Sequence, residues 1–263
     1  MGEFLLSIPL PVGISFFTFQ GISLVVDTFR QNKAVTANTQ KHQTLKRHAE
    51  NTGLFIAFFP QLVAGPIVKA HDFFPQIGVK KFRDIDWYFV FKYTLTGYFL
   101  KMVVADNLKD FTGQLEYPFF LKFSTSELLL YLFGYSMQIF ADFAGYSLIA
   151  IGISRLFGYK IMHNFNFPYI AKSFSEFWRR WHISLSTFLK EYLYIPLGGN
   201  KKGTIRTYVN LMLVMILGGL WHGAAWSYMV WGGAHGLALA AERFLRDKKT
   251  FYRHPIYEFT KGL

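Results

Sequence analysis

Long apolar runs that alternate with short polar connections dominate the hydrophobicity pattern of this sequence. The apolar runs that we expect to be embedded in a membrane cover residues 4–26, 54–68, 87–105, 128–156, 208–220 and 225–241. About 20 apolar residues suffice to cross a bilayer as a helix, and most of these runs approach that length. The pattern therefore predicts five or six membrane-embedded helices in an all-α, polytopic bundle, with residues 1–263 as a single domain.

The run 54–68 is short and is interrupted by Pro60, Gly65 and Pro66. We expect it to form a broken or re-entrant helix, which needs protein or a cavity to shield its freed backbone groups. The polar segments 31–50 and 69–86 are expected to be connections, and 106–126 to be irregular.

Residues 173–199 have a different pattern, with apolar side chains at steps of three and four. Ser173 followed by Glu176 is a capping-box signature, so a helix should begin there. The apolar stripe consists of Phe174, Phe177, Trp178, Trp181, Leu185, Phe188 and Tyr192. Such a basic, Trp-rich amphipathic stretch is typical of a helix that lies at a membrane interface. We expect one helix, ending before Pro196.

The composition supports a membrane protein and changes the interpretation of the positive net charge. Hydrophobic residues make up 52% and charged residues 17%, whereas the formal net charge is +12. The Lys and Arg residues lie between apolar runs, which is the pattern that anionic lipid headgroups and the positive-inside effect explain. Nucleic acid is therefore not an expected partner. The absence of cysteine excludes disulfides, thiolate metal sites and a cysteine nucleophile.

Ionisable residues within apolar runs are costly and are therefore candidates for function. His222 lies in LGGLWHGAAW, where neighbouring glycines leave space for a substrate or for close helix packing. A neutral imidazole can accept a proton from a hydroxyl, which predicts a general base. The alternative is a histidine that only hydrogen-bonds a neighbouring helix.

Three further residues, Arg179, Arg180 and Asp142, have two interpretations each. His182 follows Arg179 and Arg180 in WRRWHISLS, and the two arginines suit either a phosphate-bearing donor or lipid phosphates. Asp142 could bind substrate, although an ion pair within the bundle is the favoured alternative. His235 is expected to pack between helices. No metal site is expected, because the sequence has no HExxH motif and no carboxylate at ligand spacing.

Several blocks together resemble a known family. FWRRWHISLSTFLKEYLYIPLGGNKKG followed by LGGLWHGAAWSYMVWGGAHG is similar to the signature region of the membrane-bound O-acyltransferases. LPVGISFFTFQGISLVVD, FFPQLVAGPI, MQIFADFAGYSLIAIGISRLFGY and NFNFPY resemble the bacterial branch that includes alginate O-acetylases, in its order. FAGYSLIAIGIS also resembles the branch that D-alanylates teichoic acid, and IPLGGNKKG favours polysaccharide acetylation.

The resemblance implies a multi-pass enzyme of the bacterial inner membrane that moves an acyl group from a thioester to a hydroxyl. His222 would be the general base and His182 would orient or polarise the reacting groups. Substrate-binding candidates are Trp181, Trp221, Arg179, Arg180 and Asp142. The implied donor substrate is acetyl-CoA or an acyl carrier thioester, and no bound cofactor is expected.

The implied partners are membrane lipids, an exported or envelope polysaccharide as acceptor, and a periplasmic acetyl-transfer protein. Family members are longer at both ends, so we expect this chain to be partial. The competing class is a non-catalytic membrane protein.

Overall fold

The computed structural model describes residues 13–40, 44–62 and 65–247. These residues form helices, turns and irregular segments and include no strand, which confirms the all-α class for the part of the chain described. They fall into two compact units, Met1–Asn164 and Phe165–Leu263. The single domain predicted for residues 1–263 stays a prediction.

The first unit begins with short helices. They are α2 (Ile14–Phe29), α3 (Lys33–Gln40), α4 (Leu45–Ile56), α5 (Phe59–Leu62) and α6 (Ala70–Phe73), followed by the 3₁₀ turn η1 (Phe74–Gln76). The prediction that residues 31–50 form a plain connection is wrong, because α3 and the start of α4 lie there. A polar helix gives no apolar period in the sequence, and α4 instead begins at a capping residue, Thr44, whose hydroxyl accepts from the Arg47 amide.

Apolar side chains from these helices form one core in the first unit. Its buried members are Val35, Phe55, Phe58, Val68, Ala70, Phe73, Phe74 and Tyr159. Phe73 stacks on Tyr159 with ring centroids 4.8 Å apart. The run 54–68 is broken between α4 and α5, as predicted, and residues 63–64 of it lie outside the described residues.

Buried polar side chains on α2 accept hydrogen bonds from the backbone of α6. The Ser23 hydroxyl accepts from the Ala70 amide at 3.0 Å, and Asp27 accepts from the His71 amide at 3.3 Å and contacts His71 Nδ1 at 2.8 Å. Only 4% of the Asp27 side chain is exposed. Residues 4–12 of the first apolar run lie outside the described residues, and α2 continues beyond that run to Phe29.

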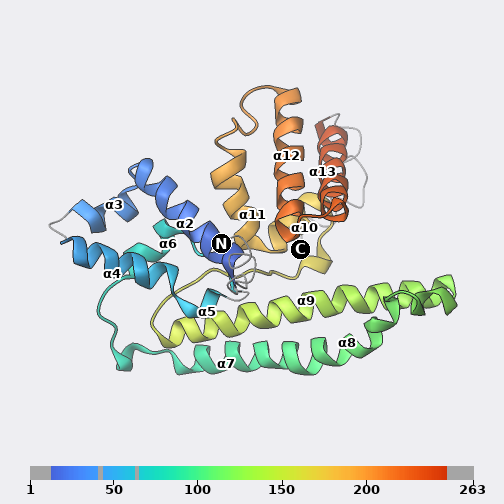
Figure 1. Ribbon diagram of the computed structural model, residues 1–263, viewed down its shortest axis with the longest axis horizontal. Helices are drawn as coiled ribbons and strands as arrows, with labels where there is room; N and C mark the ends of the chain where they lie inside the picture. Colours follow the sequence, from blue (N-terminus) through green and yellow to red (C-terminus); the bar gives the residue numbers. More distant parts are fainter. Residues whose placement is uncertain (1–12, 41–43, 63–64, 248–263) are drawn as a thin grey trace, which may run out of the picture. The chain divides into compact units, whose positions relative to one another are not determined.

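The second part of the first unit is a long antiparallel helix pair (Figure 1). It consists of α7 (Trp87–Tyr98), the π-helical segment η3 (Phe99–Ala105), α8 (Asp106–Thr112) and α9 (Thr125–Leu156). The 3₁₀ turn η2 (Phe82–Asp84) precedes α7, and η4 (Gly113–Leu115) and η5 (Phe119–Lys122) lie between α8 and α9. Residues 106–126 are therefore more helical than predicted.

Two glycines allow α7 and α9 to approach closely. A Cβ at Gly97 would lie 2.7 Å from the carbonyl oxygen of Gly145, and a Cβ at Gly145 would lie 2.8 Å from the oxygen of Gly97. No side chain fits in that space, so the backbones themselves are in contact. One turn further along, Lys101 bridges Asp106 and Asp142 at 2.7 Å each.

The second unit contains η6 (Pro168–Ile170), α10 (Phe174–Arg180), α11 (Ile183–Leu189), the π-helical η7 (Lys190–Tyr194), α12 (Thr204–His222) and α13 (Trp226–Asp247). The single helix predicted for residues 173–199 is wrong. It breaks at His182, whose φ of 44° and ψ of 54° lie in the left-handed region. Histidine is one of the few residue types enriched there, and no glycine or proline marks the position in the sequence.

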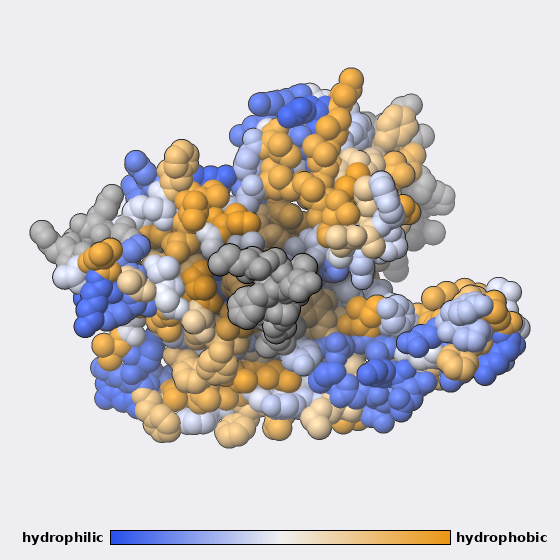
Figure 2. Space-filling model, in the orientation of Figure 1, coloured by the Kyte–Doolittle hydropathy of each residue, from blue (hydrophilic) through white to orange (hydrophobic). Residues whose placement is uncertain are grey.

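Two described helices, α9 and α12, are long and apolar enough to cross a membrane. Figure 2 shows apolar side chains over α7 and hydrophilic ones gathered around α8 and around the segment that leads into α7. The membrane prediction is thus supported for two helices, whereas the bundle of five or six embedded helices stays a prediction.

Candidate functional site

The start of α10 forms as the sequence predicts. The Ser173 hydroxyl accepts from the Glu176 amide at 3.2 Å, and Glu176 accepts from the Lys172 amide at 2.9 Å. Glu176 also binds the Arg180 guanidinium at 2.8 Å. The Lys172 amide, and then Arg180, lower the pKa of the Glu176 carboxyl. The capping residues therefore fix the helix start and one of the two candidate arginines.

Arg180 connects the end of α10 to the preceding segment. Its guanidinium donates to the Asn166 carbonyl at 3.0 Å, and its own carbonyl accepts from the Asn166 amide at 3.0 Å. Arg179, by contrast, is exposed on α10. Of the two arginines, Arg179 is the one available to a ligand.

Trp181 packs into an aromatic cluster of the same segment. Its ring stacks on Phe177 at 5.5 Å and lies edge-on to Phe165 at 5.1 Å and to Tyr169 at 6.2 Å. This places Trp181 beside residues of the NFNFPY segment.

His182 and His222 both contact one indole, that of Trp221. The Trp221 ring is 6.0 Å from the His182 ring and 4.8 Å from the His222 ring, edge-on to both. The left-handed break at His182 turns its side chain inward, where only 2% of the residue is exposed. Burial, and then the neighbouring His222, hold the pKa of His182 well below the usual histidine value. His182 is therefore a neutral imidazole near pH 7.

His222 is placed by the end of α12 and by the helix that follows. It is the last residue of α12, and α13 begins at Trp226, so only a short turn separates the two helices. Its ring lies 5.6 Å from Trp231, edge-on, and 6.3 Å from Tyr228, nearly parallel. His222 is exposed, unlike His182.

The α12–α13 pair is held together by facing glycines. A Cβ at Gly219 would lie 3.1 Å from the Gly232 Cα and would collide with the Tyr228 carbonyl oxygen. The two backbones are therefore in contact one turn before His222. This contact brings Trp231 of α13 beside the imidazole.

A third histidine, His235, also contacts these aromatic rings. The sequence predicted only a helix-packing role for it. His235 lies 4.9 Å from Trp231 and 5.2 Å from Trp178 by ring centroids. Its Nδ1 atom is buried and has no hydrogen-bond partner among the described residues. The spacing of Trp231 and His235, four residues apart on one helix, is the signal that could have placed both on the face that carries the site.

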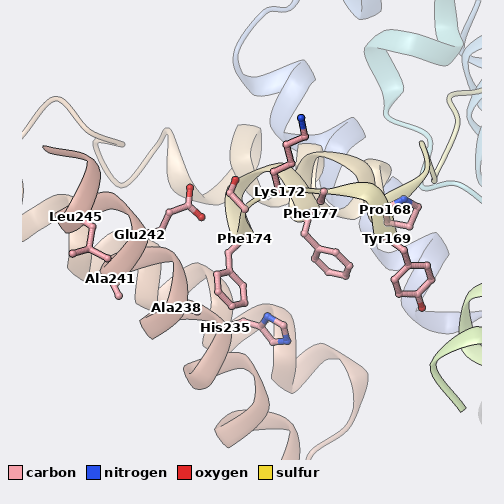
Figure 3. A pocket seen from close by; sticks show the side chains of 12 residues that line it. Pro168, Tyr169, Lys172, Phe174, Phe177, His235, Ala238, Ala241, Glu242 and Leu245 are labelled. Atoms are coloured by element: carbon pink, nitrogen blue, oxygen red, sulfur yellow. The ribbon is translucent and has the colours of Figure 1, made fainter. Parts of the chain in front are cut away.

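A cavity of about 640 Å³ lies next to His235 in the second unit, between α13, α10 and η6. Figure 3 shows the His235, Phe174 and Phe177 side chains along it, with Glu242 further along α13. Glu242 accepts from the Ser175 amide at 2.9 Å and from the Ser175 hydroxyl at 2.6 Å. The walls are mostly apolar, and they include the titratable side chains of His235, Lys172 and Glu242.

Asp142 belongs to the first unit, where its ion pair with Lys101 matches the structural alternative favoured from sequence. In the described ranges, no group of three or more His, Cys, Asp or Glu side chains is arranged to hold a metal ion. The structure thus brings together His182, Trp221 and His222, whereas Arg180 and Asp142 form ion pairs with Glu176 and Lys101.

Comparison with known proteins gives a consistent answer. Residues 7–255 match the family described as membrane-bound O-acyltransferases. The chain is 42% identical over 245 residues to a probable alginate O-acetylase of Azotobacter vinelandii, which covers 90% of this chain and 45% of that protein. It is 40% identical over 256 residues to the peptidoglycan O-acetyltransferase of Helicobacter pylori, covering 89% and 47%.

A more distant relative is the teichoic acid D-alanyltransferase of Bacillus subtilis, 28% identical over 265 residues, covering 92% of this chain and 61% of that protein. The chain spans about half the length of the acetylating relatives it matches. The resemblance found from the motifs, including the higher similarity to the acetylating branch, is confirmed.

Proposed function

The chain belongs to the membrane-bound O-acyltransferase family, and from this premise we propose that it contributes the catalytic core of an enzyme that acetylates hydroxyls of an exported or cell-envelope polysaccharide. The observation that carries the proposal is the pair of histidines on one indole, a buried His182 and an exposed His222. Acyl transfer needs a base that the acceptor can reach and a group that holds the donor carbonyl, and this pair offers both.

His222 is our candidate for the base. Its exposed imidazole at the end of α12 can receive the proton of an acceptor hydroxyl. The hydroxyl oxygen then attacks the thioester carbonyl carbon, the carbon–sulfur bond breaks, and the proton passes to the departing thiolate. This assignment needs only a neutral imidazole within hydrogen-bond distance of the hydroxyl.

His182 is our candidate for a positioning group. Because it is buried, a polymer chain does not reach it directly, and because it stays neutral near pH 7 it can donate one N–H without carrying a charge. In this role its N–H polarises the thioester carbonyl or orients the reacting groups around Trp221.

We propose that Arg179 contacts the phosphates of the donor, since it is exposed on the helix that leads to His182. Arg180 and Asp142 already hold ion pairs, and Trp181 is packed against aromatic residues. These contacts favour structural roles for the three residues. A periplasmic acetyl-transfer protein and an inner-membrane, multi-pass location complete the proposal.

The test is turnover of the donor in membranes that contain the chain. Release of thiol from acetyl-CoA is followed with and without envelope polysaccharide for the unmodified chain and for His222→Ala, His182→Ala and His48→Ala. General-base catalysis contributes about 10²- to 10⁴-fold, so His222→Ala should lower turnover by that factor. His48 lies on α4 of the first unit and serves as the matched control.

Because the chain spans about half of its acetylating relatives, the same variants are also made with the flanking segments of the Azotobacter vinelandii relative appended. Unchanged turnover in His222→Ala would refute the base assignment. Turnover with a D-alanyl carrier protein and none with acetyl-CoA would favour the second candidate, carrier-dependent D-alanyl transfer, which the similarity to the Bacillus subtilis protein supports.

A further inference from the structure

A second cavity, of about 700 Å³, lies in the first unit where α9 ends and the segment before α7 passes over it. Aromatic side chains form much of its wall, namely Phe59, Phe82, Phe157 and Tyr159. Phe59 and Phe157 meet edge-on at 5.5 Å, while Phe82 is 76% exposed. The cavity is therefore apolar in part and open to the surroundings. It takes no part in the proposed acyl transfer.

Four cations line the same cavity: Lys80, Lys81, Arg155 and Lys160. Among the described residues, no carboxylate lies within ion-pair distance of any of the four. Lys80 Nζ sits 4.5 Å over the Tyr159 ring and donates to the Gln76 carbonyl at 2.7 Å. Partial burial lowers the pKa of Lys80, so this ammonium gains from a nearby anion.

The two carboxylates that line the cavity already have other partners. Asp86 caps α7 by accepting from the Phe89 amide at 3.0 Å, and Asp84 lies 3.7 Å from Arg83. Counting the four cations against these two carboxylates leaves an excess of positive charge in the cavity.

Two carbonyl groups at the C-terminal end of α9 are hydrogen-bonded, so they do not point freely at an anion in the cavity. The Gly158 amide donates to the Arg155 carbonyl at 2.9 Å and the Tyr159 amide donates to the Ser154 carbonyl at 2.8 Å. These two hydrogen bonds, with Gly158 at a φ of 75°, satisfy two of the last carbonyls of the helix.

The position of the cavity along α9 indicates its surroundings. α9 is one of the helices able to cross a membrane, and the cavity lies at its C-terminal end. Trp87 and Tyr88, at the start of the antiparallel α7, are 40% and 76% exposed. Trp and Tyr gather at the level of lipid headgroups, so this end of the pair lies at that level.

We propose that this cavity is a binding site for the phosphate headgroup of a membrane phospholipid. The phosphate is held by Lys80, Arg155 and Lys160, and the aromatic walls receive the glycerol and the first carbons of the acyl chains. Guanidinium and ammonium groups bind phosphate through charge-assisted hydrogen bonds, and apolar walls next to them select an amphiphile over a free ion.

The experiment measures the affinity of the purified full chain in detergent for fluorescent phosphatidylglycerol. The cavity variant is Lys80→Gln with Lys160→Gln, which removes two exposed charges without opening the core. The matched control is Lys46→Gln with Lys109→Gln, which removes two exposed charges of the same unit from α4 and α8. A lost contact of this kind corresponds to about tenfold in affinity, so the cavity variant should bind at least about tenfold more weakly.

The control variant should change the affinity less than twofold, and both variants should keep the circular dichroism spectrum of the unmodified chain. Arg155→Gln removes the charge of a half-buried side chain, and its affinity for the lipid is measured in the same way. Equal losses in the cavity and control variants would overturn the proposal, because they would indicate nonspecific attraction. Displacement of the lipid by equimolar CoA or inorganic phosphate would also overturn it, since the site would then bind soluble phosphates.

Discussion

The contact between His71 and Asp27 allows a quantitative test of how the first unit is held together. The imidazole Nδ1 lies 2.8 Å from a carboxylate that is only 4% exposed. Replacing His71 by Ala removes this partner, while the backbone amide still donates to Asp27. A hydrogen bond to a charged group contributes about 1.5–3 kcal/mol, so the free energy of unfolding should fall by about that amount.

The same contact predicts a dependence on pH. The hydrogen bond to Asp27 raises the pKa of His71, burial opposes the rise, and Asp72 adds to it while Lys69 subtracts from it. A raised pKa in the folded chain means that the stabilisation is complete below the ordinary histidine pKa of about 6.5 and is lost as pH rises through the higher folded value. Stability should therefore decline from mildly acidic to alkaline pH.

The assay is denaturant unfolding of the purified chain in detergent, followed by circular dichroism at a series of pH values. His71→Ala should lose both the stability and its decline with pH, whereas His48→Ala, on α4, should keep both. Hydrogen exchange at the Ala70 amide, which donates to Ser23, should quicken in His71→Ala. An unchanged pH slope in His71→Ala would refute the reasoning.

Two other predictions concern helix pairs. Gly232→Leu places a side chain against the Met215 carbonyl oxygen, so it should separate α12 from α13. Thermal stability and any donor turnover should both fall. The control is Gly233→Leu, whose added Cβ has nothing within 4 Å and which should leave both quantities nearly unchanged. Lys101→Met leaves Asp106 and Asp142 facing each other without their shared cation. Because the Asp106 and Asp142 side chains are 48% and 44% exposed, we expect the free energy of unfolding to fall by only about 0.2–1 kcal/mol for each of the two lost pairs, with Lys92→Met as the control.

Much of the second unit could be predicted from sequence because its signals are local. The cap at Ser173, the glycines beside Trp221 and the apolar runs around them are all read within a few residues. The break at His182 could not be predicted, because its left-handed conformation depends on packing around a buried imidazole and not on a glycine or proline. A continuous apolar stripe therefore suggested a single helix.

The first unit was predicted less well because its contacts connect distant residues. Asp27 marked only the end of an apolar run, and His71 lay in a polar connection, yet 44 positions apart they form a buried contact. The polar helix α3 gives no apolar period, so segment 31–50 was interpreted as a connection. The sequence predicted only that Asp142, a carboxylate within an apolar run, would pair with a lysine or arginine, and it did not identify Lys101.

The short turn between α12 and α13 also determines how deep any chemistry takes place. α12 has 19 residues and ends at His222. At about 1.5 Å per residue it spans about 28 Å, close to the thickness of the hydrocarbon layer. Because α13 turns back at once, the length of α12 sets the distance between Thr204 at its start and the imidazole at its end. Adding or removing a turn of α12 would move His222 by about 5.4 Å along the axis of that helix.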